Sequence, residues 1–173
     1  GITLHKGIIE NMIIKPSEED SGIVFVRSDK TKNNIIKAKY SNVTNTILCT
    51  KLSNDYNISI STVEHLMAAF IGFGIDNATI EIDGPELPIL DGSSSSFIKA
   101  FKKIGLRKLK SYRKVINVLK KISIQENDKF ITIEPNDYLS IKMKINHDCK
   151  LIRLQSYSFN LKGNSFEDEL MYA

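Results

Sequence analysis

The sequence has few of the residues that would place it in a cross-linked or membrane-spanning class. Its two cysteines, Cys49 and Cys149, have neither the number nor the spacing of a disulfide framework or a Cys-x-x-Cys metal site, so we expect reduced, isolated thiols. No stretch approaches the roughly 18 consecutive apolar residues that span a bilayer. The N-terminus also lacks a charged segment followed by a long apolar block. We therefore expect no transmembrane segment and a cytoplasmic location.

What is present is the composition of a globular protein. Hydrophobic residues make up 42% of the 173-residue chain, which is enough for one domain or two small ones with a real core. The net charge is +4, and 20 of the 24 cationic residues are lysines. Lysine makes compact contacts with anions, without the bidentate fork of arginine. The charge therefore gives a mild preference for an anionic ligand.

Both ends of the sequence look cut. It begins at Gly1 without a methionine, and residues 171–173 look like the first turns of a helix. We therefore expect a fragment of a longer protein.

Apolar periodicity predicts short strands and two helices in the first part of the chain. The expected strands are residues 8–14, 23–26, 35–40, 44–52 and 77–82, and the first two are expected to be antiparallel. A helical period starts at Ser61 and stops at Gly72 and Gly74. A second helix is expected from residue 93 to Gly105.

A polar, basic segment at residues 105–114 has the composition of an interdomain linker, and we place a boundary near residue 110. Further strands are expected at 115–124, 130–133, 139–145 and 157–161, with a hairpin turn at residues 126–128, before a helix that starts at Ser165. This recurrence predicts an α+β protein with two-layer sheet-and-helix sandwiches. Residues 1–110 would form a complete first domain, and residues 111–173 the truncated beginning of a related second one.

Residues 61–65, with sequence STVEH, place a carboxylate and an imidazole on the first turn of the first helix. In a structural interpretation, Ser61 and Glu64 form a capping box, and His65 has no special task. In a catalytic interpretation, neutral His65 offers a ring nitrogen to zinc. Glu64, about 100° round the helix, then takes a proton from a metal-bound water. The two interpretations are compatible, and these residues alone do not choose between them.

The sequence does not contain a complete zinc site by any local motif. A catalytic zinc takes three protein ligands and one water, but the only other histidines are His5 and His147. His147, beside Asp148, could donate, and a solvated turn histidine is the alternative. His5 is expected to be either a site-wall residue or a hydrogen-bonded structural one.

Several ordered segments resemble one enzyme family. They are residues 61–66 (STVEHL), 72–77 (GFGIDN) and 85–93 (PELPILDGS). Residues 1–5 (GITLH) resemble a further segment, Gly-x-Gly-Leu-His, with Thr3 in place of the second glycine. The sequence is thus similar to the UDP-3-O-acyl-N-acetylglucosamine deacetylases of lipid A biosynthesis, most closely over residues 1–110.

The resemblance implies a zinc-dependent hydrolase. Such an enzyme removes the N-acetyl group of UDP-3-O-acyl-N-acetylglucosamine as acetate, the committed step of lipid A and lipopolysaccharide synthesis in Gram-negative bacteria. The histidine that matches His65 is a zinc ligand, and the glutamate that matches Glu64 is the general base. The family's other ligands, in a His-x-x-x-Asp helix, and its general-acid histidine lie beyond Ala173. The resemblance therefore implies Zn²⁺ as cofactor and a chain that is inactive alone.

Further matches concern the substrate. Leu48 and Cys49 match a strand that lines the family's cleft, although an apolar strand segment is core by default. Lys129 matches a lysine that holds the uridine diphosphate, and a solvated hairpin lysine is the alternative. Ile145 stands where the family often has a phenylalanine against the uracil ring, so stacking would be lost. Asp91 is expected to serve the fold by capping the second helix.

Two other functions stay open from the sequence. The basic stretch 99–121 could form a Lys-rich module that binds nucleic acid or an anionic membrane surface. Because runs of charge are mostly solvated faces, we expect no nucleic-acid partner and at most transient contact with a membrane surface. The chain could also be a non-catalytic remnant. The expected state is a monomer whose partner is UDP-3-O-acyl-N-acetylglucosamine.

Overall fold

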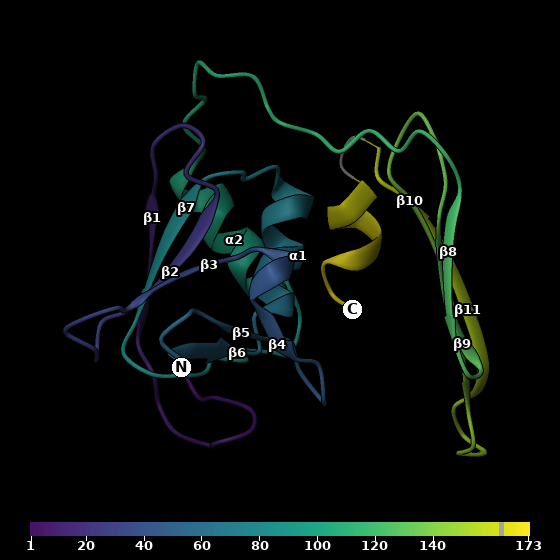
Figure 1. Cartoon of the computed structure of the whole chain (residues 1–173), viewed down its shortest axis with the longest axis horizontal. Helices are drawn as coiled ribbons and strands as arrows, with labels where there is room; N and C mark the ends of the chain where they lie inside the picture. The colour runs from purple at the N-terminus through teal and green to yellow at the C-terminus, as the bar shows by residue number, and fades with distance from the viewer. Residues whose placement is uncertain (163–164) are drawn as a thin grey trace. The chain divides into compact units, whose positions relative to one another are not determined.

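The computed structural model of the protein describes residues 1–162 and 165–173, which form two compact units (Figure 1). The first unit comprises Gly1–Tyr112 together with Glu167–Ala173, and the second comprises Arg113–Phe166. The chain mixes helices with several small, mostly antiparallel sheets, in agreement with the predicted α+β class.

The largest sheet of the first unit has the strand order β1-β7-β2-β3. Its strands are β1 (Met12–Pro16), β2 (Ile23–Arg27), β3 (Ile35–Lys37) and β7 (Ala78–Ile82). β7 pairs antiparallel with β1 and parallel with β2. The first two strands therefore run antiparallel to each other, as predicted, but β7 lies between them. The segment 17–22 is long enough to step over one strand, and β7, with its buried alanine and isoleucines, takes the central place.

One row of the sheet register explains why this order is stable. Ile14 lies opposite Ile80, Ile80 beside Phe25, and Phe25 opposite Ile36. The last three side chains of this row are fully buried. Burial of each of these side chains stabilises the folded state by about 1.5–3 kcal/mol, because its apolar surface is removed from water. The row gives the four strands a common apolar face.

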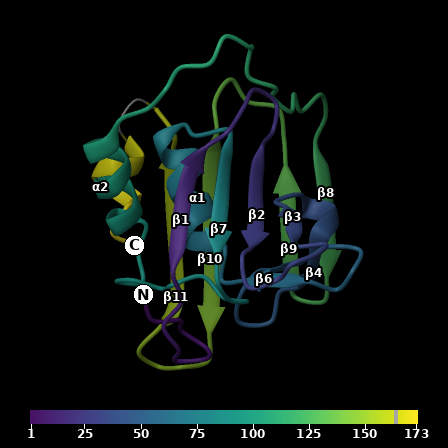
Figure 2. The same ribbon diagram turned by 90° about the vertical axis from the view of Figure 1, so that its left-hand side faces the viewer.

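Helices α1 (Glu64–Phe73) and α2 (Ser95–Ile104) lie on one side of this sheet (Figure 2). They meet through Phe70 and Phe101, whose rings stack with centroids 5.5 Å apart. The predicted ends of both helices are confirmed, since Gly74 closes α1 in the left-handed region, at φ 77°, and Gly105 follows α2. Both helices have ten residues, against about 20 for a bilayer, and none of the described helices can span a membrane.

A second, three-stranded sheet consists of β4 (Val43–Asn45), β5 (Lys51–Ser53) and β6 (Ser59–Ser61), after a short 3₁₀ turn at Tyr40–Asn42. The predicted continuous strand 44–52 is therefore wrong. The Asn45 side chain accepts the Ile47 amide, and Leu48 has a φ of 62°, so the chain turns where a strand was expected.

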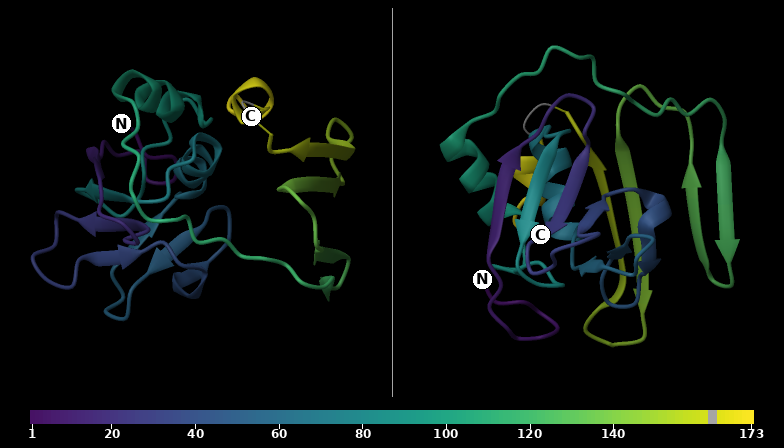
Figure 3. Two further views of the ribbon diagram at one scale, coloured as in Figure 1. Left: turned by 90° about the horizontal axis from the view of Figure 1, so that it is seen from above. Right: turned by 60° about the vertical axis from the view of Figure 1, so that its left-hand side comes forward.

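The second unit consists of two antiparallel hairpins (Figure 3). Their strands are β8 (Ile122–Glu126), β9 (Lys129–Ile133), β10 (Ser140–His147) and β11 (Arg153–Asn160). The predicted hairpin turn at 126–128 is confirmed by the β8–β9 register, and Asn127 has a φ of 55°. The strand expected from residue 115 begins only at Ile122. The helix predicted from Ser165 is present as the short π-helical turn Phe166–Leu170.

Candidate active site

The Glu64–His65 pair begins helix α1, three residues later than the predicted start. Ser61 belongs to strand β6, where its hydroxyl donates to the Pro85 carbonyl at 3.1 Å. The helix has no side-chain cap. The capping-box interpretation is therefore wrong, because Ser61 is held by the sheet and the Glu64 carboxylate is held elsewhere.

The Glu64 carboxylate is oriented by the loop that precedes β5. Glu64 Oε2 accepts the backbone N–H of Thr50 at 3.0 Å, and the Glu64 side chain is half-buried. Within the described residues, Oε1 has no hydrogen-bond partner. One oxygen is thus fixed by the protein backbone, and the other is available to accept a proton.

The predicted substrate residues Leu48 and Cys49 directly precede Thr50, the residue whose amide holds the Glu64 carboxylate. The Leu48 side chain is 86% exposed, and Cys49 is half-buried. The alternative that these residues form a core strand is wrong, because they lie in the loop between β4 and β5.

His65 is half-buried and lies one position further along α1. Its carbonyl accepts the Ser94 hydroxyl at 3.1 Å, which ties this turn of α1 to the start of α2. Among residues 1–162 and 165–173, the ring nitrogens of His65 have no hydrogen-bond partner. This leaves the imidazole free to bind a ligand. The described residues contain no group of three or more side chains that could hold a metal ion.

The turn into α1 contains a strained residue. Thr62 has a φ of 59° and is 3% exposed. A β-branched residue in this left-handed region costs about 1–3 kcal/mol and persists only where its surroundings enforce it. Ser61 on its N-terminal side is fixed from both sides, because its N–H donates to Pro85 at 2.9 Å and its carbonyl accepts from Leu87 at 3.0 Å.

A fully buried carboxylate, that of Glu86, meets this turn. Glu86 Oε1 accepts the His5 amide at 2.8 Å and the Thr62 hydroxyl at 3.3 Å, while Oε2 accepts the Lys6 amide at 3.2 Å. Its donors are thus two successive backbone amides and a hydroxyl, which is a concave arrangement suited to an anion. Glu86 joins the N-terminal loop to the turn before α1.

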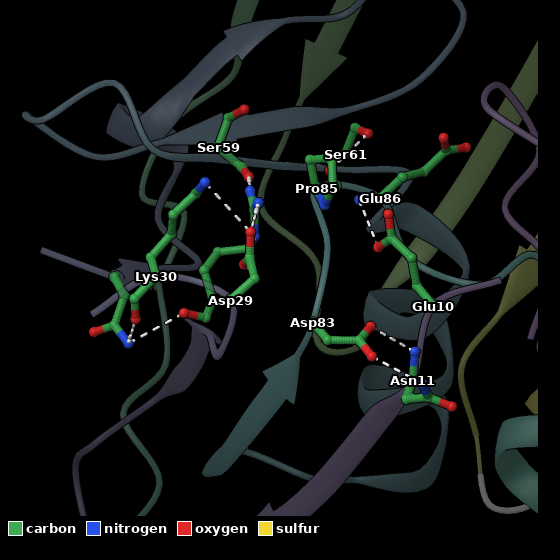
Figure 4. A network of polar contacts seen from close by, with 11 residues as sticks. Glu10, Asn11, Asp29, Lys30, Ser59, Ser61, Asp83, Pro85 and Glu86 are labelled. Atoms are coloured by element: carbon green, nitrogen blue, oxygen red, sulfur yellow. Dashed lines mark hydrogen bonds and ion pairs between the residues drawn. The ribbon is translucent and has the colours of Figure 1, made fainter. Parts of the chain in front are cut away.

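Glu10 supports Glu86 from the other side. Glu10 Oε2 accepts the Glu86 amide at 3.1 Å (Figure 4), and Oε1 is buried with no partner among the described residues. Burial raises the pKa of Glu10, against a smaller opposing effect of the Glu86 amide and of the nearby Arg27 charge. A Cβ at Gly84 would lie 2.0 Å from the Glu10 carboxyl carbon, so the glycine makes room for this acid.

Arg27 connects the four-stranded sheet, which contains β2, to the three-stranded sheet, which contains β6. Its guanidinium donates to both Asp29 oxygens, at 2.8 and 2.7 Å, and to the Ser59 carbonyl at 2.6 Å. The bidentate hydrogen bond to Arg27 lowers the pKa of Asp29. Because Ser59 begins β6, Arg27 fixes the strand that leads to Thr62 and α1.

The whole chain, residues 1–173, matches the family described as LpxC: UDP-3-O-acyl N-acetylglycosamine deacetylase. The chain belongs to this family.

Two relatives of this LpxC-family chain are named UDP-3-O-acyl-N-acetylglucosamine deacetylase. The protein from Nautilia profundicola is 39% identical over 173 residues, which is 100% of this chain and 58% of the relative. The protein from Francisella tularensis subsp. tularensis is 43% identical over 154 residues, 88% of this chain and 54% of the relative. The chain therefore spans somewhat more than half the length of these relatives.

The remaining predicted residues of the LpxC-family chain lie apart from α1 in the sequence. Lys129 begins β9 in the second unit, opposite Glu126, and Ile145 lies on β10 opposite Gln155. Their assignments to the uridine diphosphate stay predictions. His5 has an exposed side chain, and its role comes through its backbone amide. His147 Nδ1 accepts the Cys149 amide at 3.0 Å, as expected of a turn histidine.

Four residues that shape the site of this LpxC-family chain were not predicted from its sequence: Thr50, Thr62, Glu86 and Glu10. Thr50 acts through its amide, which every non-proline residue has. Glu86 had one usable signal, since an acid between Pro85 and Leu87 in an otherwise apolar segment must be satisfied if it is buried. Glu10 had a similar signal, because an acid that directly follows Ile8 and Ile9 also needs a hydrogen-bond partner if it is buried.

Proposed function

We propose that the protein containing this chain is a zinc-dependent amide hydrolase that removes the N-acetyl group of UDP-3-O-acyl-N-acetylglucosamine and releases acetate, the committed step of lipid A synthesis. The observation that carries the proposal is the pair at the start of α1. Glu64 has one carboxylate oxygen fixed by Thr50, and the imidazole of the neighbouring His65 has no hydrogen-bond partner among the described residues. Family membership supports the choice of substrate.

Glu64 is the proposed general base. The Thr50 amide holds Oε2, so the carboxylate keeps its direction, and Oε1 can take a proton from the water that attacks the acetamide carbon. A base that is oriented before the substrate arrives avoids the entropy cost of finding that geometry. Proton removal makes the water nucleophilic enough to attack an amide.

His65 is the proposed zinc ligand of this chain. Its ring nitrogens, which have no partner in the part of the chain that the structure describes, are donors of the kind that zinc prefers. Bound zinc would supply Lewis acidity that polarises the acetamide carbonyl. Since the described residues hold no group of three metal-binding side chains, we propose that the other ligands come from elsewhere in the protein. Residues 1–173 alone are accordingly proposed to be inactive.

Substrate contacts are proposed for Leu48, Cys49 and Lys129. Leu48 and Cys49 belong to the loop that ends at Thr50, so they lie in the same segment as the amide that holds Glu64. Lys129 is exposed and could meet a diphosphate as a point charge. The enzyme is proposed to work as a cytoplasmic monomer.

For the fold, we propose two related sheet-and-helix domains, with residues 1–110 as the first and 111–173 as the beginning of the second. The strands within residues 113–166 support this proposal, whereas the terminal residues Glu167–Ala173 belong to the first compact unit.

The Lys-rich binding module has less support. Lys102 forms an ion pair with Glu167, and the Lys99 ammonium lies 5.4 Å from the centre of the Tyr172 ring. Two lysines of the basic stretch are thus engaged within the first unit. Contacts of this kind reduce the charge available to a nucleic acid or membrane.

The experiment is an acetate-release assay on the full-length protein that contains this chain, with UDP-3-O-acyl-N-acetylglucosamine as substrate. We expect turnover that is lost on chelation and restored by Zn²⁺. Absence of turnover in the metal-loaded protein would support a non-catalytic remnant and reject the proposal. Residues 1–173 alone should bind zinc weakly, because one histidine is a poor site.

A further inference from the structure

The strained turn at Thr62 requires something that enforces its conformation. Thr62 lies between β6 and α1, two residues before Glu64, and has a φ of 59°. The backbone hydrogen bonds of Ser61 to Pro85 and Leu87 fix the residue before it. They do not determine φ of Thr62 itself, because they end one residue earlier.

The side chain of Glu86 provides the missing constraint. Glu86 lies beside Ser61 in an isolated parallel bridge, and its Oε1 accepts the Thr62 hydroxyl. The same carboxylate accepts the amides of His5 and Lys6. We call this arrangement the Glu86 clamp: Glu86 with the Thr62 hydroxyl and the His5 and Lys6 amides.

The clamp is itself held rigidly. Glu86 is 0% exposed, and its amide donates to Glu10, which is 2% exposed. Figure 4 shows the Glu10 carboxylate directed at the Glu86 backbone. A buried carboxylate with three donors has few alternative positions, because any movement breaks bonds that water cannot replace.

We propose that Glu86 is a positioning residue for the Glu64–His65 pair. By holding the Thr62 hydroxyl, the Glu86 clamp keeps the turn before α1 in its left-handed conformation, which sets where the first two side chains of the helix point. The clamp also fixes the N-terminal loop at His5 to the same turn. This inference rests on the proposed function, and it assigns Glu86 no contact with substrate or metal.

The test starts from Glu86→Gln in the full-length protein. This substitution keeps the shape but places an NH₂ group against one of the donors, so the clamp opens. Displacement of the base by about 1 Å lowers kcat by about 100-fold, while KM changes much less because substrate contacts remain. Amide hydrogen exchange at His5, Lys6 and the first turn of α1, measured on the metal-free protein, should accelerate.

The decisive arm is a rescue. Glycine adopts positive φ without strain, so Thr62→Gly in the Glu86→Gln background should keep the turn without the clamp. We expect kcat to recover by about tenfold or more. If Glu86 only stabilised the fold, the second substitution could change stability but would restore no activity. Failure of the rescue in a folded double variant would therefore overturn the proposal.

A milder variant covers the case in which Glu86→Gln does not fold. Thr62→Val removes the hydroxyl but leaves the His5 and Lys6 bonds in place. We expect a fall in kcat of about tenfold with little change in melting temperature, and an unchanged kcat would contradict the proposal. The matched control is Glu81→Gln, the same substitution on β7 at a residue that pairs with Lys15, which should leave kcat unchanged.

The two hypotheses fail differently. If the wild-type protein releases no acetate, the proposed function is wrong, and the Glu86 clamp is judged by hydrogen exchange alone. Faster exchange at His5, Lys6 and the start of α1 in Glu86→Gln would still support it. If wild-type turnover is present and Glu86→Gln retains it in full, the positioning role is wrong and the function stands.

Discussion

The Thr50 amide donates to the Glu64 carboxylate at 3.0 Å, although the two residues are 14 positions apart and belong to a loop and a helix. The loop before β5 thus sets the direction of the Glu64 carboxylate. Substitution of Glu64 therefore has a chemical consequence, loss of the proposed base, and a structural one, loss of this hydrogen bond.

Replacement of Glu64 by glutamine or alanine should distinguish these consequences. Both variants lose the base, so turnover of the full-length enzyme should fall by about 100-fold or more with zinc retained. Glutamine keeps an acceptor for Thr50, and alanine does not. We therefore expect the free energy of unfolding to fall by about 1 kcal/mol in Glu64→Ala but not in Glu64→Gln. Near-normal turnover in either variant would reject the base assignment.

Gly84→Ala should destabilise the protein through Glu10. A Cβ added at residue 84 would lie 2.0 Å from the Glu10 carboxyl carbon. The φ of Gly84 lies outside the left-handed region, so the backbone at this position is one that alanine adopts. We expect a loss of about 1–3 kcal/mol in the free energy of unfolding, measured in urea. In a Glu10→Ala background the space is free, so the cost should be smaller by about 0.5–3 kcal/mol. Equal costs in both backgrounds would show that the glycine serves another purpose.

Glu10 should make stability depend on pH in a defined direction. Burial raises its pKa above the ordinary value of 4.5. A raised carboxyl pKa contributes stability that is complete below the unfolded value and is lost as pH rises through the folded value. Compared with Glu10→Gln, which cannot ionise, the wild-type protein should lose free energy of unfolding as pH rises above 4.5. Urea titrations at several pH values measure this, and parallel curves would contradict the prediction.

Asp91 should act in the opposite sense. Hydrogen bonds from the Ser95 hydroxyl and the Ser93 amide lower its pKa to about 2. Its stabilising effect is present above the unfolded pKa of about 3.9 and is lost as pH falls toward about 2. The stability difference between wild type and Asp91→Asn should therefore shrink over this acidic range. A difference that persists at the lowest pH would indicate that the side-chain shape, not its charge, supports the turn.

The fold was predictable where the pattern is local. The α1 stop at Gly74, the α2 stop at Gly105 and the hairpin at Asn127 follow from backbone conformations that few residues adopt easily. Strand partners were not predictable, because alternation tells which face of a strand is buried but not which strand lies beside it. The order β1-β7-β2 depends on contacts between residues about 60 positions apart.

The candidate site was predictable only in its two most reactive residues. Glu64 and His65 carry distinctive chemistry, so the sequence and a family resemblance could single them out. The capping-box alternative is wrong because Ser61 is a strand residue. Its backbone forms hydrogen bonds with Pro85 and Leu87, which are distant in the sequence. Thr50 and Glu86 matter through backbone amides and burial, which leave no local pattern in the sequence.

The central place of β7 also constrains how the first unit forms. β1 and β2 are synthesised early, but the strand that must lie between them ends at Ile82. Ribosomes add about 5–20 residues per second, so the two early strands wait for seconds with no partner between them. Pairings so distant in the chain are slow to form. The nascent N-terminal segment should therefore be a target for chaperones until Ile80 takes its place beside Phe25.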